Sequence, residues 1–370
     1  MPEGQLRRTG VLIRGFRSGK SFVGRCLSCR PNHTGIGPCF HFIQVDDVSR
    51  ASRQCYDRSM KRPAAELLSV KMIWERAPHN AFTDLARHRG SWFCCFREGG
   101  AHALCAGKVR VLRSEDGAFW ESAALIAERG VDLRDPKLSE APDGSLEILM
   151  GGSPVRMGRY EGRRPRISRS RDGLSWTKPL PIAEEGDWLW RVDRRGGRSY
   201  GISYRLQSPR RWTVALLESS DGLDYHVLVE LGVPGKPNEA TLRFRGKQAV
   251  ALVRREAGEG RAWIGRSLPP YRSWSWKETA ERVGGPNFIV LPGGALIAAT
   301  RIWRRGKPLM ALCAMTTGSL RPILELPSGG DCGYPGMVLH RGILWISYYS
   351  SHEDKARIYL ARVRLSVPGA

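Results

Sequence analysis

The chain has 370 residues, 41% of them hydrophobic and 12 of them tryptophan, which is enough apolar material for a substantial core. Its formal net charge is +23, which suits anionic partners, but the basic residues are dispersed and match no nucleic-acid-binding motif. We therefore expect no nucleic-acid partner, and the absence of any apolar run of about 18 residues predicts no membrane span.

The nine cysteines are odd in number and unevenly placed, and Cys94 and Cys95 are adjacent. This pattern argues against a disulfide framework and favours a reducing compartment. The N-terminus has basic residues but lacks the apolar core and cleavage site of a secretory signal. We expect a cytoplasmic monomer, with secretion as the alternative if the true start of the protein lies further along the sequence.

Residues 1–60 differ from the rest of the chain, because they are rich in Arg, Ser and Gly and have weak periodicity. We interpret them as a poorly ordered leader, or alternatively as a wrongly assigned start with Met60 as the first residue. Several of their side chains are zinc ligands by type, but the spacing fits no common zinc finger, so we expect no metal and no other cofactor. These side chains are Cys26, Cys29, His33, Cys39, His41 and Cys55.

Residues 61–370 are expected to form a single domain built from short strands. Ser69–Trp74 alternates and is rich in β-favouring residues, which predicts a strand. After it, a unit of three or four short strands recurs six times, with hardly any helical period. The six units have their first strands at Ala81–Ala86, Pro136–Leu138, Trp188–Val192, Glu239–Phe244, Asn287–Leu291 and Tyr334–Leu339.

A heptad of the form S-x-D-G-x-x-[WY] closes each of the first three units, at Ser114–Trp120, Ser170–Trp176 and Ser219–Tyr225. Asp-Gly between two extended runs is a tight hairpin, because glycine takes positive φ without steric cost. The Ser hydroxyl and the Asp carboxylate can bond the N–H groups of the turn, and the aromatic residue can pack beneath it. In the fourth unit Pro269-Pro270 replaces the Asp-Gly turn.

Repeats about 50 residues apart are typical of propeller blades. Six of them predict an all-β fold, a six-bladed β-propeller. A ring must close, because an open ring leaves the end blades with unpaired strand edges. The sixth unit runs out of chain after its third strand, so we expect the N-terminal strand Ser69–Trp74 to complete the last blade.

The innermost strands of a propeller converge on a central channel, where a buried charge needs a partner or a ligand. Arginines there offer permanently charged forks for a carboxylate, a Glu beside a Tyr can make the phenol a nucleophile, and a separate Asp can act as acid and base. Tryptophans such as Trp188 and Trp190 either stack on a sugar face or pack in the core. The candidate residues are Asp84, Asp135, Arg191, Glu239, Tyr334, Arg97, Arg254 and Arg301.

The heptads resemble the Asp-boxes of the sialidase (neuraminidase) superfamily, and the resemblance covers about residues 69–365. Pro237–Leu242, followed by Arg254, is similar to the segment that carries the sialidase glutamate and one arginine of its carboxylate-binding triad. Arg301 stands where another triad arginine is expected, and Gly333–Gly336 resembles the segment of the nucleophilic tyrosine. The resemblance implies a glycosidase that cleaves a terminal acidic sugar, sialic acid or similar.

In that scheme Tyr334 and Glu239 form the nucleophile pair, and Asp84 or Asp135 is the acid/base. The first triad arginine is missing, because Ala81–Leu85 contains no Arg, and Arg97 is a candidate for part of its role. The substrate would be a glycan, expected to be anionic.

Other interpretations stay open. The missing arginine and the missing secretion signal favour a non-catalytic propeller that binds glycan or protein. A third alternative is another glycan-active enzyme on the same scaffold, such as a lyase or an arabinosidase-like hydrolase. Each candidate also has a purely structural interpretation, in which Arg254 and Arg301 form ion pairs, Tyr334 packs in the core and Asp135 makes a turn.

Overall fold

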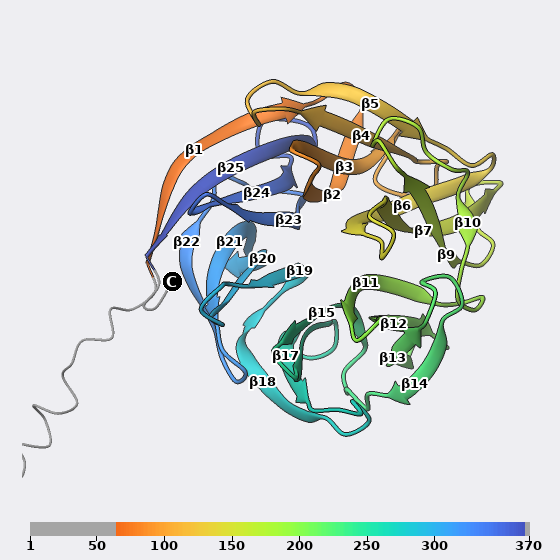
Figure 1. Ribbon diagram of the computed structural model, residues 1–370, viewed down its shortest axis with the longest axis vertical. Helices are drawn as coiled ribbons and strands as arrows, with labels where there is room; N and C mark the ends of the chain where they lie inside the picture. Colours follow the sequence, from red (N-terminus) through yellow and green to blue (C-terminus); the bar gives the residue numbers. More distant parts are fainter. Residues whose placement is uncertain (1–63, 367–370) are drawn as a thin grey trace, which may run out of the picture. The chain divides into compact units, whose positions relative to one another are not determined.

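The structure, a computed structural model, describes residues 64–366, all of which belong to the second of the two units into which the chain divides, Met60–Ala370. These residues form strands and no helix. The strands make six antiparallel sheets that surround a central axis (Figure 1). The predicted all-β six-bladed propeller is therefore confirmed, while the leader and its zinc-ligand types lie outside the described residues.

Each sheet is one blade, with its first strand nearest the axis (Figure 1). Blade 1 contains β2 (His79–His88), β3 (Ser91–Gly99), β4 (Lys108–Ser114) and β5 (Glu121–Ile126). Blade 2 contains β6 (Val131–Glu140), β7 (Leu146–Arg156), β8 (Arg159–Tyr160), β9 (Arg164–Ser170) and β10 (Leu180–Pro181). Blade 3 contains β11 (Trp188–Arg195), β12 (Arg198–Leu206), β13 (Trp212–Ser219) and β14 (His226–Glu230).

The remaining blades repeat this order. Blade 4 contains β15 (Pro237–Arg245), β16 (Gln248–Arg255), β17 (Arg261–Ser267) and β18 (Ser275–Arg282). Blade 5 contains β19 (Gly284–Val290), β20 (Leu296–Arg304), β21 (Lys307–Met315) and β22 (Leu320–Glu325). Blade 6 contains β23 (Cys332–His340), β24 (Ile343–Ser350), β25 (Arg357–Ser366) and, from the start of the described chain, β1 (Ala64–Trp74).

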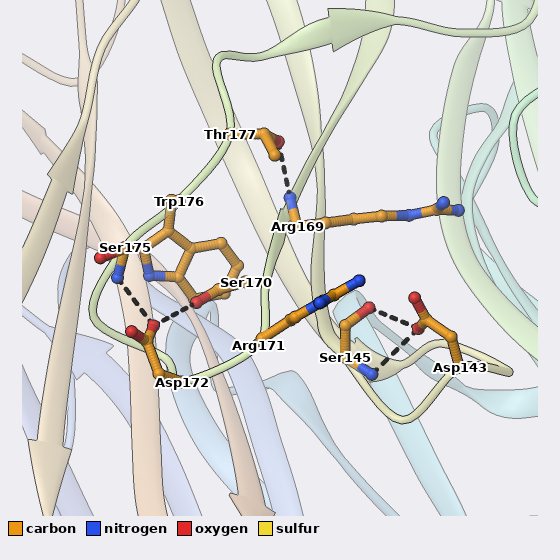
Figure 2. A pocket seen from close by; sticks show the side chains of 9 residues that line it. All are labelled: Asp143, Ser145, Arg169, Ser170, Arg171, Asp172, Ser175, Trp176 and Thr177. Carbon is orange, nitrogen blue, oxygen red and sulfur yellow. Dashed lines mark hydrogen bonds between the residues drawn. The ribbon is translucent and has the colours of Figure 1, made fainter.

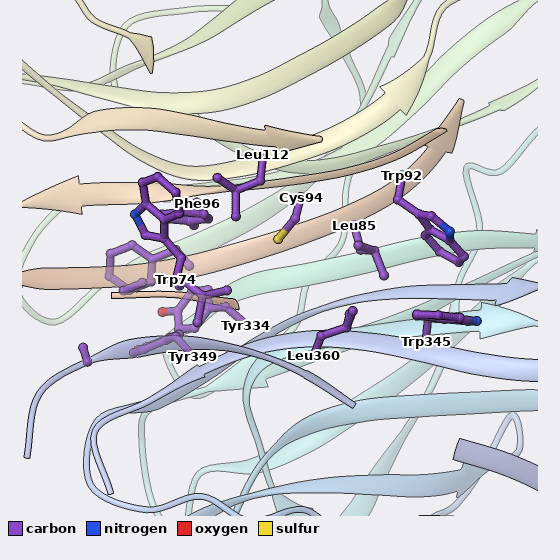
Figure 3. Packing of buried hydrophobic residues seen from close by; sticks show 14 of the residues in the cluster. Trp74, Leu85, Trp92, Cys94, Phe96, Leu112, Tyr334, Trp345, Tyr349 and Leu360 are labelled. Carbon is purple, nitrogen blue, oxygen red and sulfur yellow. The ribbon is translucent and has the colours of Figure 1, made fainter. Parts of the chain in front are cut away.

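Strand β1 closes the ring, as expected, by pairing antiparallel with β25 along its length. Trp74 at its end is 5% exposed, and its Nε1 donates a 2.6 Å hydrogen bond to Glu98 of blade 1. The closure is an apolar core between blades 6 and 1, in which the rings of Trp92 and Trp345 lie 4.5 Å apart (Figure 3). Packing therefore joins the last blade to the first, and β1 supplies the fourth strand of the last blade.

The heptads make the turns that their residues predict. In Ser170–Trp176, Oδ1 of Asp172 accepts hydrogen bonds from two N–H groups of the turn, of which that of Ser175 is drawn in Figure 2. Trp176 Nε1 donates to Gly173 O at 3.0 Å. The same Ser–Gly and Asp–backbone contacts recur in Ser114–Trp120 and Ser219–Tyr225. Each of these three turns thus satisfies its own polar groups locally, which is why the sequence pattern predicts the turn.

The fourth blade keeps this geometry without the Asp-Gly pair. Tyr271 has φ of +63°, close to the +76° of Gly173, and Trp274 Nε1 donates to Tyr271 O at 2.9 Å. The indole-to-carbonyl contact is therefore preserved although Pro269-Pro270 precedes it.

All six innermost strands carry a bulge at the same level of the ring. The register shifts between the flanking pairs Ala81/Asp84, Arg134/Lys137, Leu189/Val192, Pro237/Ala240, Gly284/Asn287 and Gly333/Gly336. A bulge bends the strand and re-aims its side chains, and bulges are over-represented beside functional sites.

Four of the six bulges place a residue at positive φ. Three of these residues have side chains: Phe82 at +64°, Asp135 at +50° and Tyr334 at +54°. Such a conformation costs on the order of 1–3 kcal/mol and persists only where the surroundings hold it. Asp135 and Tyr334 are therefore held by the ring in positions that their local sequence does not favour.

Candidate functional site

Tyr334 and Glu239 meet at the axis of the propeller. Oη of Tyr334, on the bulge of β23, donates a 2.5 Å hydrogen bond to Oε1 of Glu239, on the bulge of β15. The other carboxylate oxygen accepts from Arg254 Nη1 at 2.7 Å and from the N–H of Gly285 at 2.8 Å. Glu239 is thus fixed by three donors from three strands, and its free orientation is lost.

Charge and burial set the protonation of this pair. Burial alone would raise the pKa of Glu239, but the positive charge of Arg254 and the hydrogen bond from Tyr334 outweigh it, and the pKa is lowered. Burial, followed by the neighbouring Glu239 charge, raises the pKa of Tyr334 well above its usual value. At rest the pair is a neutral phenol that donates to a carboxylate, with the acceptor in place for the phenolic proton.

A cavity of about 810 Å³ opens beside the pair and has both residues in its wall. Its size lies in the range of small-molecule sites. Strands and connections of blades 1–3 supply much of the remaining wall, including His102, Arg134, Tyr160, Arg163, Trp188 and Tyr204. The hollow of about 440 Å³ beside the heptad of blade 2 (Figure 2) shares none of these residues and belongs to the hairpin.

Asp135 adds a second carboxyl group to the wall. Its Oδ2 accepts a 3.1 Å hydrogen bond from Trp188 Nε1, and its Oδ1 is buried without a partner among the described residues. Burial raises the pKa of Asp135, although the charges of Arg134 and Lys137 oppose it. Asp135 is therefore a carboxyl group that tends to hold its proton beside a carboxylate that does not, which is the division of roles used in acid/base chemistry.

Three of the candidate charges form ion pairs away from this cavity. Asp84 accepts hydrogen bonds of 2.9 Å from both terminal nitrogens of Arg191, and Leu138 N donates to the same carboxylate at 2.8 Å. Arg97 is fully buried and donates from Nε to Asp132 at 2.7 Å. None of these three predicted residues lines the cavity. Asp84 and Arg191 pair with each other instead, and Arg97 pairs with Asp132.

Arg254 and Arg301 lie next to the Tyr334–Glu239 pair. Arg254 binds Glu239 and, through Nη2 at 2.6 Å, Glu256. Arg301 donates to the carbonyl of Cys332 at 3.0 Å, and its buried Nε has no partner among the described residues. The two arginines carry the charge that keeps Glu239 ionised, and Arg301 keeps one donor free.

Sequence reasoning missed Arg134, which directly precedes Asp135. Its Nη1 donates to Tyr160 Oη at 2.9 Å and to the carbonyl of His102 at 3.0 Å. Its Cζ lies 4.8 Å from the ring centre of Phe82, which occupies the bulge of the first blade. Arg134 therefore places a cation over the ring on the first bulge, and its Nη1 also lies 3.4 Å from Oδ2 of Asp132.

Arg163 was also missed, because it lies in the short connection between β8 and β9, in a basic run that nothing in the sequence distinguishes. Its Cζ lies 5.0 Å from the ring centre of Tyr204 and 5.8 Å from that of Trp188. Nε donates to Gly186 O at 3.2 Å, while Nη2 is buried and has no partner among residues 64–366. Arg163 thus presents an uncompensated cation to the cavity.

Comparison with known proteins gives a fold and no family. No protein-family model matches the chain, and no curated protein sequence matches it. A protein of unknown function from Dyadobacter fermentans is similar in structure, with a TM-score of 0.72, 19% identity, and coverage of 82% of this chain and 100% of that one.

Two enzymes of known class share the fold. The α-L-arabinofuranosidase of Fusarium graminearum, solved with arabinobiose, has a TM-score of 0.62 and 11% identity over 81% of this chain and 98% of that one. The sialidase of Trypanosoma rangeli, solved with sialic acid, has a TM-score of 0.58 and 12% identity over 81% of this chain and 59% of that one. At these identities the similarity establishes a propeller of the sialidase type.

Proposed function

We propose that this protein is a glycoside hydrolase that removes a terminal acidic sugar, with Tyr334 as nucleophile and Glu239 as the base that takes its proton. The observation that carries the proposal is the 2.5 Å Tyr334–Glu239 hydrogen bond in the wall of a cavity of about 810 Å³. Two further observations support it. Glycan hydrolases share the fold, and the heptads and strand segments of the sequence resemble those of sialidases.

The residues divide the reaction into two displacements. In the first, Tyr334 Oη attacks the anomeric carbon while its proton passes to Glu239, and Asp135 protonates the departing glycosidic oxygen. In the second, a water molecule attacks the glycosyl–tyrosine bond, gives its proton to Asp135, and the phenol recovers its proton from Glu239. Two displacements retain the anomeric configuration. A neutral phenol also brings no negative charge against an anionic sugar.

The acidic group of the substrate would be bound by arginines of the cavity wall. Arg163 has a free guanidinium nitrogen, and Arg134 fills the region where the first inner strand lacks an arginine. A guanidinium offers a carboxylate a planar pair of donors. We assign this role to Arg134 and Arg163, whereas Arg301 does not line the cavity and Arg97 stays in its ion pair. Trp188 would support the sugar face.

An arabinosidase-like hydrolase for a neutral sugar is the second candidate. Arg254 already pairs with the carboxylates of Glu239 and Glu256, and an apolar residue, Phe82, occupies the first bulge. Both features favour a substrate without a carboxylate. The same nucleophile pair would serve both substrates, so the arginines decide between them. A cytoplasmic location and a monomeric state stay predictions of the sequence.

The test is hydrolysis of a panel of fluorogenic glycosides, including α-sialosides, α-L-arabinofuranosides and hexuronides, by the wild type and Tyr334→Phe. We expect turnover of an acidic member, a loss of at least about 10³-fold in Tyr334→Phe, and a covalent adduct on Tyr334 when a fluorinated slow substrate is used. Tyr359→Phe, a tyrosine that bonds Glu353, is the matched control and should leave the rate unchanged.

Three results decide the matter. Equal rates in Tyr334→Phe and the wild type would exclude the proposed nucleophile. Turnover of the arabinofuranoside alone would favour the second candidate. Binding of an acidic glycan without turnover of any substrate would leave a glycan-binding propeller.

A further inference from the structure

Two imidazoles and a carboxylate converge beside the cavity from three separate segments. His79 begins β2, His102 lies in the connection between β3 and β4, and Asp331 directly precedes β23. Oδ2 of Asp331 lies 2.7 Å from His102 Nδ1 and 3.1 Å from His79 Nε2. The three atoms lie within 4.8 Å of one another. None of these side chains has a role in the proposed hydrolysis.

The donor set matches a divalent transition metal. Zinc binds imidazole nitrogen and carboxylate oxygen at about 2.0–2.2 Å in tetrahedral sites, which sets neighbouring ligand atoms roughly 3.3 Å apart. The separations of 2.7 and 3.1 Å from Oδ2 are close to that spacing, and the two imidazole nitrogens lie within 4.8 Å of each other. Three protein ligands leave a fourth position for water or a bound molecule.

The surroundings orient the carboxylate toward the imidazoles. Tyr349 Oη donates a 2.7 Å hydrogen bond to Oδ1 of Asp331, so Oδ2 is the oxygen that remains for an ion. The N–H of Asp331 is fixed by Ser351 Oγ at 2.8 Å. Outer hydrogen bonds of this kind are what hold metal ligands in position.

Access and location fit a bound ion. The His79 side chain is 13% exposed and lies among aromatic rings, whereas that of His102 is 51% exposed and gives the cluster a route to solvent. Arg301 Nη1 lies 3.9 Å from Oδ1 of Asp331, whereas the two imidazoles face Oδ2. His102 also lines the cavity, so an ion here lies in its wall.

We propose that His79 Nε2, His102 Nδ1 and Asp331 Oδ2 bind one divalent transition-metal ion, with zinc as the ion that the donor set favours. Binding is independent of the proposed hydrolysis, because the three ligands are separate from Tyr334, Glu239 and Asp135. The alternative is a set of His–carboxylate hydrogen bonds with no affinity for metal.

The test is titration of the full-length protein with Zn²⁺ by calorimetry, and with Co²⁺ by absorption, after removal of metal with a chelator. We expect the wild type to bind one equivalent of ion. His102→Ala and Asp331→Asn should lose this site, with binding at least about 100-fold weaker. Tyr349→Phe should weaken binding by about 10-fold, because it removes an outer hydrogen bond. His226→Ala, an exposed histidine paired with Glu218, is the control and should retain the ion.

The cobalt spectrum separates this site from any site made by the cysteines near the N-terminus. A nitrogen and oxygen site gives visible ligand-field bands without the near-ultraviolet thiolate charge-transfer bands of a cysteine site. Visible bands that vanish in His102→Ala while thiolate bands persist would support the proposal. Equal stoichiometry and equal spectra in the wild type and His102→Ala would overturn it, as would the absence of binding in the wild type.

Discussion

The phenol of Tyr334 donates a 2.5 Å hydrogen bond to Glu239 across 95 residues of sequence. The two residues belong to blades 6 and 4, whose inner strands are separated by β19, and Gly285 of that strand donates its N–H to the same carboxylate. The packing of three successive blades brings these strands to one point, so the proposed chemistry depends on the arrangement of the blades around the axis.

Gly285→Ala should disable the site more than the fold. A Cβ on Gly285 would lie 2.7 Å from Cδ2 of Tyr334, and the backbone there has φ of +56°, so the ring must move away from Glu239. We expect kcat to fall by about 10²-fold or more, since small displacements of reacting groups cost that much. Gly306→Ala has a similar positive φ with no neighbour within 4 Å, and it should cost only about 1 kcal/mol of stability. Unchanged kcat in Gly285→Ala would contradict the assignment of Tyr334.

The pH profile of kcat/KM should be a bell with an acidic optimum. Glu239 must be ionised, and its pKa is lowered from 4.5, so activity is lost only as the pH falls through that lowered value. Asp135 must hold its proton, and its pKa is raised from 3.8, so activity falls as the pH rises through the raised value. Asp135→Asn should remove the basic limb and slow substrates with poor leaving groups far more than aryl glycosides. A basic limb that persists in Asp135→Asn would assign the acid to another residue.

Arg163→Met should weaken the binding of an acidic sugar. The change removes a cation whose Nη2 has no partner among the described residues and whose Cζ lies over the Tyr204 ring, and it keeps an unbranched side chain of similar length. Hydrogen bonds to charged groups contribute about 1.5–3 kcal/mol, so KM should rise by about 10- to 100-fold with little change in kcat. Arg210→Met, an equal change of charge at an exposed position, is the control. Equal KM values in the two variants would separate Arg163 from the substrate.

Asp84→Ala should destabilise the propeller strongly. It leaves Arg191 buried without its carboxylate, a change that typically costs about 3–5 kcal/mol, measured as a shift in the midpoint of urea unfolding. Glu66→Gln, which breaks an exposed pair with Arg364, should cost less than about 1 kcal/mol. If the two substitutions shift the midpoint equally, the Asp84–Arg191 pair is not a structural element of the channel.

The fold was predictable because its signals are local. Asp172 accepts hydrogen bonds from N–H groups of its own turn, so the heptad alone is enough to predict the turn. Strand β1 was predicted by elimination, since the sixth blade lacked a strand and Ser69–Trp74 was the one left over.

The site was predictable only in part, because bulges decide where side chains point. Tyr334 and Glu239 were found as polar residues on inner strands, but so was Asp84, which pairs with Arg191. Sequence order cannot distinguish a charge that faces another charge from one that faces a cavity. Arg163 was missed for a different reason, since it reaches the cavity from a connection between strands, where arginines are common.

The seam between β1 and β25 has a consequence for synthesis of the protein. Lys71 pairs with Leu360, so the first described strand must wait for nearly the whole chain before it finds its partner. At about 5–20 residues per second, a ribosome takes roughly 15–60 seconds to make the intervening segment. Throughout that interval the strand has an unpaired edge beside the growing chain, and chaperones that shield such edges would act on this protein before its last blade emerges.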